Sequence, residues 1–162
     1  MTLRTPWIAL CLLVLAGCAD MLAPGTRGPD EAGTQGTQQQ VRSAAATLLE
    51  GFRRYDNGRF QEAIAVLNTP EMQAAPAPIR VEALKYTAFS YCVTEDYARC
   101  RHAFDLAFAI DAGFDLRNSE RGHPMWGPVF DAAKAASAQD REHASLDHDR
   151  ERWRGIDLWR AR

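Results

Sequence analysis

The cluster of side chains with the most potential for chemistry lies near the carboxyl end: His143, Asp147, His148 and Asp149. Imidazole and carboxylate groups bind zinc, and two residues four apart share one face of a helix. The surrounding residues are mostly charged and offer few apolar side chains that could enclose a metal. We therefore predict a solvated segment and no metal site. His123 is interpreted as a residue at the entry to a helix and not as a general base.

Motifs for other kinds of catalysis are missing from the sequence. It contains neither a nucleophile elbow nor a glycine-rich phosphate loop. We predict no enzymatic activity and no cofactor, so a small hydrolase or metal-dependent protein that uses the histidines near the carboxyl end is the least favoured functional hypothesis. The 162 residues include 19 basic and 21 acidic side chains, and the net charge of -2 provides no argument for nucleic-acid binding.

The four cysteines fall into two groups. Cys11 and Cys18 lie in or directly after an apolar amino-terminal run, whereas Cys92 and Cys100 lie in the body of the chain. The spacing of the later pair is not that of a zinc site, which takes closer pairs with further ligands nearby. An even pair in an oxidising compartment favours a structural disulfide, and the alternative is two free thiols. Closing this short loop would stabilise the domain by about 2 to 3 kcal/mol.

Residues 1–17 have the layout of a secretory signal peptide. Arg4 provides the positive start, residues 7–15 form the apolar run, and small residues follow. The run is too short for a membrane-spanning helix, which needs about 20 apolar residues. We therefore expect the segment to be removed during export.

The ending of this segment, Leu15-Ala16-Gly17-Cys18, resembles the lipobox of bacterial lipoproteins. The resemblance implies that the Cys18 thiol receives a diacylglycerol and that this cysteine becomes the new amino terminus. The residue after it, Ala19, implies an outer-membrane lipoprotein that faces the periplasm. The alternative is an ordinary signal peptide followed by an incidental cysteine.

The regions that flank the central domain have a composition unlike that of a packed core. Residues 18–40 begin with the lipidated cysteine and are rich in glycine, proline and glutamine, which predicts a flexible tether. Residues 139–162 are rich in Asp, Arg, Glu and His, which predicts a charged, partly disordered tail. Its two tryptophans, Trp153 and Trp159, could instead contact a partner or the headgroup region of a membrane.

The apolar residues between positions 41 and 138 recur at intervals of three and four, which predicts an all-α domain. Glycines, prolines and short polar turns separate the apolar runs. The expected helices are Val41–Tyr55, Arg59–Leu67, Ile79–Thr94, Tyr97–Ile110 and Met125–Ala138. Pro70 shortens the second of them. The apolar run of the last begins at about Met125, but its helical turns are expected to start at Pro128, because proline suits a first turn.

The third and fourth expected helices contain small and aromatic residues at the spacing A-x2-Y-x8-C-x3-F-x2-A. This spacing, from Ala88 to Ala107, resembles a tetratricopeptide repeat. A weaker copy lies earlier in the chain, with Gly51, Gly58, Ala63 and Leu67 in the places of Ala88, Glu95, Cys100 and Phe104. We predict tetratricopeptide-like helical hairpins, about two repeats plus a capping helix. Trp126, Val129 and Phe130 would cover the open face of the second repeat.

The first helices of successive repeats of this kind line a concave face. On the alignment above, the face carries apolar side chains beside one charge pair: Leu48, Phe52, Tyr55, Glu82, Lys85 and Phe89. An aromatic stripe flanked by charges would suit an extended or helical peptide, so we interpret these residues as a partner-binding surface. The alternative is that Phe52 and Phe89 pack into the small core.

Four parts of the sequence together resemble the TssQ-type lipoproteins that accompany bacterial type VI secretion systems: Leu15–Cys18, Glu82–Cys92, Cys100 and Gly122–Phe130. The resemblance implies an accessory outer-membrane lipoprotein without chemistry of its own. Its partners would be periplasmic or membrane-complex proteins of the secretion apparatus, with the membrane reached through the lipid anchor and no nucleic acid involved. The second hypothesis is a helical-repeat lipoprotein of general envelope assembly, of the type that assists barrel insertion or pilus secretin assembly.

Overall fold

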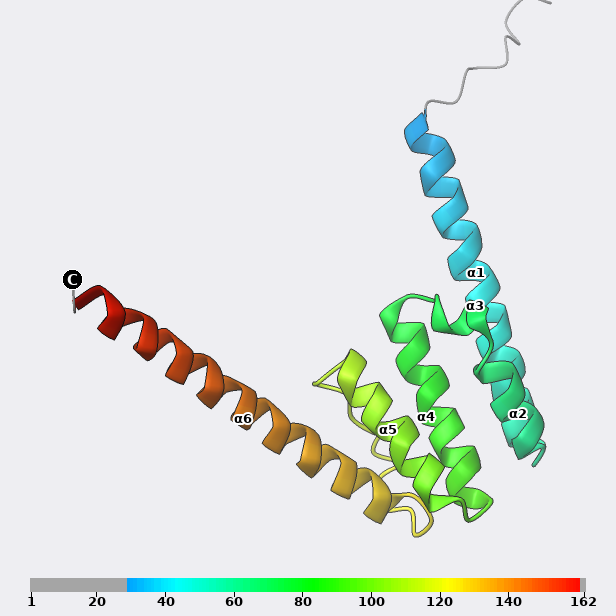
Figure 1. Ribbon diagram of the computed structural model, residues 1–162. Coiled ribbons are helices and arrows are strands. Elements are labelled where there is room, and N and C mark those ends of the chain that lie inside the picture. The colour runs from blue at the N-terminus through cyan, green and yellow to red at the C-terminus, as the bar shows by residue number, and fades with distance from the viewer. Residues whose placement is uncertain (1–28, 161–162) are drawn as a thin grey trace, which may run out of the picture. The chain divides into compact units, whose positions relative to one another are not determined.

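The computed structural model describes residues 29–160, with side chains from position 35 to position 153. The described backbone forms six helices and no strand: α1 (Pro29–Asp56), α2 (Phe60–Leu67), α3 (Pro70–Gln73), α4 (Ala77–Val93), α5 (Tyr97–Ile110) and α6 (Gly127–Arg160) (Figure 1). The all-α prediction is confirmed, whereas the assignment to tetratricopeptide-like repeats stays a prediction. Within the described part of the chain, no helix combines the length and the apolar character that a bilayer crossing requires.

The chain divides into two units, residues 1–36 and residues 37–162. Of the first unit, the structure describes residues 29–36, which form the beginning of α1. The predicted signal peptide, the lipidation site Cys18 and most of the predicted tether lie outside the described residues. The packing described below belongs to the second unit.

The two terminal helices are longer than the sequence predicts. The flexible tether predicted through position 40 is wrong for residues 29–40, which are part of α1. Proline is common in the first turn of a helix, where its missing N–H would be unpaired anyway, and the glutamines that follow are good helix formers. The charged tail after Ala138, which the sequence predicts to be partly disordered, continues α6 as far as Arg160.

The distal part of α6 is nevertheless solvated, as predicted. Between positions 139 and 153 every side chain is exposed except that of Asp149, which is half-buried. Trp153 is 66% exposed, and Trp159 lies outside the residues with described side chains. No glycine or proline interrupts the sequence from 139 to 154, and ion pairs such as Asp147–Arg150, spaced three apart, support an exposed helix.

Helices α1 and α2, and likewise α4 and α5, form two helical hairpins with tight turns. Each turn contains one residue with positive φ, Gly58 at 72° and Glu95 at 62°. These two positions are the ones that the sequence alignment places opposite each other. A second aligned pair, Ala63 and Cys100, has no exposed surface in either hairpin. The two hairpins therefore share a turn conformation and a buried position that the alignment predicts.

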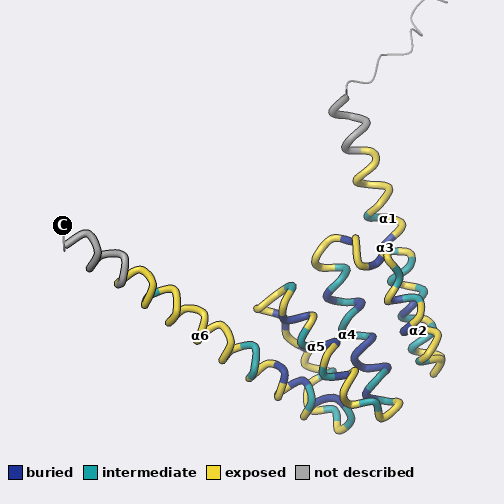
Figure 2. Tube along the Cα trace, viewed as in Figure 1, coloured by how far each residue is buried: buried dark blue, intermediate teal, exposed yellow. Residues whose placement is uncertain are grey.

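Two clusters of buried side chains hold the helices together. Figure 2 shows where buried residues lie along the chain. The larger cluster joins α4, α5, the loop after α5 and the start of α6, and it contains Phe89 and Phe130. The smaller cluster joins the helices α1 to α4 and contains Leu67 and Met72. Tyr86 packs against both clusters. Helix α4 is therefore the central element of the domain.

Helix α2 is short because Pro70 follows its last turn. It has 8 residues, whereas its counterpart α5 has 14. Pro70 then begins the single-turn helix α3, in which the Thr69 hydroxyl accepts a hydrogen bond from the backbone N–H of Met72. The sequence predicts the shortening at Pro70 but not α3, because a helix of one turn has no apolar period to recognise.

Gly51 allows α1 to lie close to α2. A Cβ atom at this position would be 2.3 Å from Cδ2 of Leu67, which is 3% exposed. We expect Gly51→Ala to lower the free energy of unfolding by about 1 to 3 kcal/mol, because Leu67 would have to leave its packed position. Urea unfolding followed by circular dichroism measures the change.

The matched control is Gly36→Ala in the same helix, where the added Cβ would meet no atom within 4 Å beyond the adjacent residues and the helix's own backbone. This variant is expected to leave the stability unchanged or to raise it by up to about 1 kcal/mol. A Gly51→Ala protein as stable as the wild type would show that close contact at this position is not a constraint on the fold.

Candidate functional site

The face between α1 and α4 is the surface that the sequence predicts for a partner. The two helices do meet there, since the ring centroids of Phe52 and Tyr86 are 4.0 Å apart and those of Tyr55 and Phe89 are 6.2 Å apart. The loop between α5 and α6 covers the α4 side of this face. Trp126, at the end of that loop, stacks on Phe89 with centroids 4.2 Å apart. The protein's own chain therefore occupies part of the predicted binding surface.

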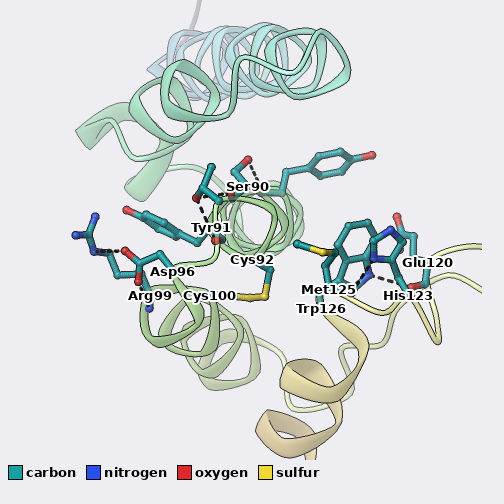
Figure 3. The surroundings of a disulfide bond; sticks show 12 residues. Ser90, Tyr91, Cys92, Asp96, Arg99, Cys100, Glu120, His123, Met125 and Trp126 are labelled. Atoms are coloured by element: carbon teal, nitrogen blue, oxygen red, sulfur yellow. Dashed lines mark hydrogen bonds and ion pairs between the residues drawn. A yellow bond between two sulfur atoms is a disulfide. The ribbon is translucent and has the colours of Figure 1, made fainter.

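Trp126 lies between two rings. Besides Phe89 it stacks on His123, with centroids 3.4 Å apart and ring planes at 3° to each other (Figure 3). The indole N–H of Trp126 donates a hydrogen bond to the carbonyl of Glu120 at 2.9 Å. The backbone N–H of Met125 donates to Nδ1 of His123 at 3.2 Å. His123 thus stands at the entry to α6 and positions the tryptophan, in agreement with its interpretation as a helix-entry residue.

Lys85 is the one charged side chain of the described residues that is almost fully buried, at 1% exposure. Its Nζ lies 2.9 Å from Oε2 of Glu82 and 3.0 Å from Oε1 of Glu120. Glu120 also accepts a hydrogen bond from the backbone N–H of Arg117 at 2.9 Å. A buried ammonium group needs such partners, because removing it from water costs several kcal/mol. Lys85 therefore fastens the loop to α4.

The partner-binding interpretation is wrong for Lys85 and Phe89, which are 1% and 2% exposed. For Phe89 the alternative holds, since the ring packs in the core against Trp126. The other four residues of the predicted face are half-buried: Leu48, Phe52, Tyr55 and Glu82. The capping role predicted for Trp126, Val129 and Phe130 agrees with their place in the larger cluster.

Cys92 and Cys100 form a disulfide that joins α4 to α5 (Figure 3). Their Cα atoms are 5.2 Å apart, and neither residue has exposed surface. The pairing that the sequence favours is therefore present in the structure. At this place the bond acts as a cross-link within one hairpin.

The histidine and aspartate side chains described in α6 do not form a cluster. His143, Asp147 and His148 are exposed, and Asp147 pairs with Arg150 at 3.0 Å. Asp149 pairs with Arg152. Among the residues that the structure describes, no three His, Cys, Asp or Glu side chains are placed to hold a metal ion.

A groove that the sequence analysis does not predict lies between α2 and α5, with α4 as its floor. We call it the outer groove. It has two parts, of about 570 and 430 Å³, which share Asn68, Leu84 and Leu106 as lining residues. Leu106 is 42% exposed. The short α2 explains the groove, because a helix as long as α5 would extend past Pro70 into this space.

The outer groove offers contact surface and no set of reactive groups. Its lining contains no cysteine and no acidic side chain. The chain matches no known protein family, no curated protein and no solved structure. Functional proposals accordingly rest on the residues and contacts described above and on the amino-terminal sequence.

The two lysines of the chain provide a direct test of the buried ion pair. The Lys85 side chain is 1% exposed, whereas that of Lys134 is 48% exposed. We expect reductive methylation of the native protein to modify Lys134 and to leave Lys85 unmodified until the protein is unfolded in urea. Mass spectrometry of the peptides measures both sites. Equal reaction rates in the native protein would contradict the burial of Lys85.

The pKa of Tyr55 provides a second test. Burial raises the pKa of this phenol to about 12, and Tyr86, Asp56 and Glu120 add to the shift. Because an unfolded tyrosine has a pKa of about 10, the unfolded chain loses this proton first as the pH rises. The contribution of Tyr55 to stability is therefore complete below the unfolded pKa and is lost as the pH rises towards about 12.

An ultraviolet absorbance titration of the wild type is expected to contain a phenol step near pH 12, and Tyr55→Phe is expected to remove it. Tyr97→Phe is the control, since Tyr97 is 48% exposed and its loss should leave that step in place. A titration curve with the same high-pH step in Tyr55→Phe would show that Tyr55 is not its source.

Proposed function

We propose that this chain is a non-catalytic, lipid-anchored outer-membrane protein that acts as a periplasmic protein-binding scaffold, as an accessory component of a type VI secretion system. The observation that supports the binding function is the outer groove. It is open, it is lined by leucine and alanine side chains together with polar ones, and Leu106 stands exposed within it. A concave site with apolar walls and a few polar groups is the usual form of a binding site.

The proposal of a lipid anchor is supported by the first residues of the chain. The sequence Leu15-Ala16-Gly17-Cys18 directly follows the apolar run, at the place where a lipobox cysteine stands. Each buried CH2 of an acyl chain contributes about 0.8 kcal/mol to membrane binding, and two chains are sufficient for stable anchoring. A lipidated Cys18 would therefore hold the domain at the membrane without a spanning helix.

The proposed place in a secretion apparatus is supported by the resemblance to TssQ-type lipoproteins. The most specific segment of that resemblance is Pro124–Phe130. In this chain it forms the turn in which Trp126 packs on Phe89 and His123. The segment thus has a defined role in closing the domain. It does not line the outer groove, which lies on another side of α4.

The experiment combines crosslinking in living cells with purification of a tagged protein from envelope membranes. The wild type is expected to copurify with membrane-complex subunits of the secretion system. Cys18→Ser is expected to move the protein out of the membrane fraction and to reduce that recovery at least about tenfold, because the thiol that would receive the diacylglycerol is lost and with it the acyl chains. Mass spectrometry identifies the partners.

Cys11→Ser is the matched control, since it removes a thiol from the predicted signal peptide and should leave both localisation and recovery unchanged. Recovery of barrel-assembly, secretin or cell-wall proteins instead would overturn the secretion-system assignment and favour the general envelope-assembly function. Membrane attachment that persists in Cys18→Ser would overturn the lipid anchor.

A further inference from the structure

We infer that the outer groove binds a peptide segment of a partner protein that combines large apolar side chains with Asp or Glu. This inference rests on the proposed function, because it specifies the chemistry of the partner that the scaffold holds. It does not depend on which apparatus the partner belongs to.

The apolar requirement follows from the centre of the groove. Leu84 and Leu106 line both of its parts, and Leu106 is 42% exposed. Along α4 the lining extends from Arg80 to Tyr91. At 1.5 Å per helical residue this is a length of about 16 Å. It accommodates about five residues of an extended segment or about three turns of a helix.

The acidic requirement follows from the charges. The basic side chains Arg80, Arg99 and His102 line the groove, and no acidic side chain does so, although the chain has 21 acidic and 19 basic residues. Arg99 already pairs with Asp96 at 3.1 Å and lies over the ring of Tyr91. Arg80 forms no ion pair with any residue that the structure describes. Its guanidinium group is therefore available to a carboxylate of the partner.

A polar group in the floor favours a peptide over a lipid chain. Thr87 lines the groove and is 2% exposed, and its hydroxyl has no hydrogen-bond partner among the described residues. An unpaired buried hydroxyl is unfavourable, and threonine in a helix alternates between two side-chain rotamers. Because Thr87 lines the groove, a backbone amide or carbonyl of a bound peptide is the kind of group that could pair with this hydroxyl. An acyl chain has no such group.

The test selects binders from a random dodecapeptide library displayed on phage, with the protein isolated from cell envelopes in mild detergent. We expect the enriched peptides to contain at least two large apolar residues and at least one Asp or Glu. Fluorescence anisotropy then gives the affinities of synthetic copies. Arg80→Glu is expected to weaken binding about fivefold or more, because it replaces an attraction with a repulsion, and Leu106→Asp to abolish it.

Arg42→Glu is the matched control, since Arg42 is an exposed arginine on α1 that does not line the groove. It should leave the affinity unchanged. Circular dichroism and urea unfolding establish that each variant is folded, and a folded Leu106→Ala protein replaces Leu106→Asp if the aspartate prevents folding.

Three results would overturn the inference. The first is no enrichment above the level of the Leu106 variant, and the second is enrichment of peptides that lack acidic residues. The third concerns the oligomeric state without peptide. If the wild type sediments as a dimer and the Leu106 variant as a monomer, a second copy of the chain occupies the groove. None of these results depends on the recovery of secretion subunits from cells, so failure of this inference and failure of the proposed function are distinguishable.

Discussion

The stack of Phe89, Trp126 and His123 closes the end of a helical array that is too short to cover itself. Two hairpins leave one face of the second without a neighbour, and exposed phenylalanine rings there would be unfavourable in water. The loop after α5 covers this face by placing Trp126 on Phe89. The ion pair of Lys85 with Glu120 fastens the same loop to α4. Stacking buries the rings, and the ion pair holds the loop in place on α4.

This closure decides which surfaces of the domain remain available. The loop fills much of the α4 side of the face that a helical repeat would offer to a peptide, so half-buried side chains such as Phe52 of α1 and Glu82 of α4 remain near its edge. The opposite side of α4 has no corresponding cover. There the short α2 leaves a groove with Leu106 exposed. The surface available for binding is thus the result of one loop that is present and one helix that is short.

The sequence is most informative where local patterns determine structure. The bounds of α2, α4 and α5 lie within two residues of the prediction, because apolar periodicity and breakers such as Gly58 and Pro70 act over short distances. The disulfide is likewise predictable, since Cys92 and Cys100 are eight positions apart and are the two cysteines that lie in the body of the chain. The extents of α1 and α6 are not predictable in this way, because the side chains described in their outer turns, at 35–40 and 139–153, are exposed except for the half-buried Asp149 and give no core-facing period. The burial of Lys85 also escapes prediction, since its partner Glu120 is 35 positions away in a loop.

The connection between α2 and α4 has an evolutionary consequence. The single turn α3 contributes Met72 and Gln73 to one end of the outer groove, whereas the larger cluster of buried side chains lies on the other side of α4. Insertions and deletions are tolerated best in surface connections. Changes in the length of this connection would lengthen or shorten the groove while the disulfide and the stacked rings stay in place. A lineage built on this domain could therefore diversify in what it recognises without renewed selection for the ability to fold.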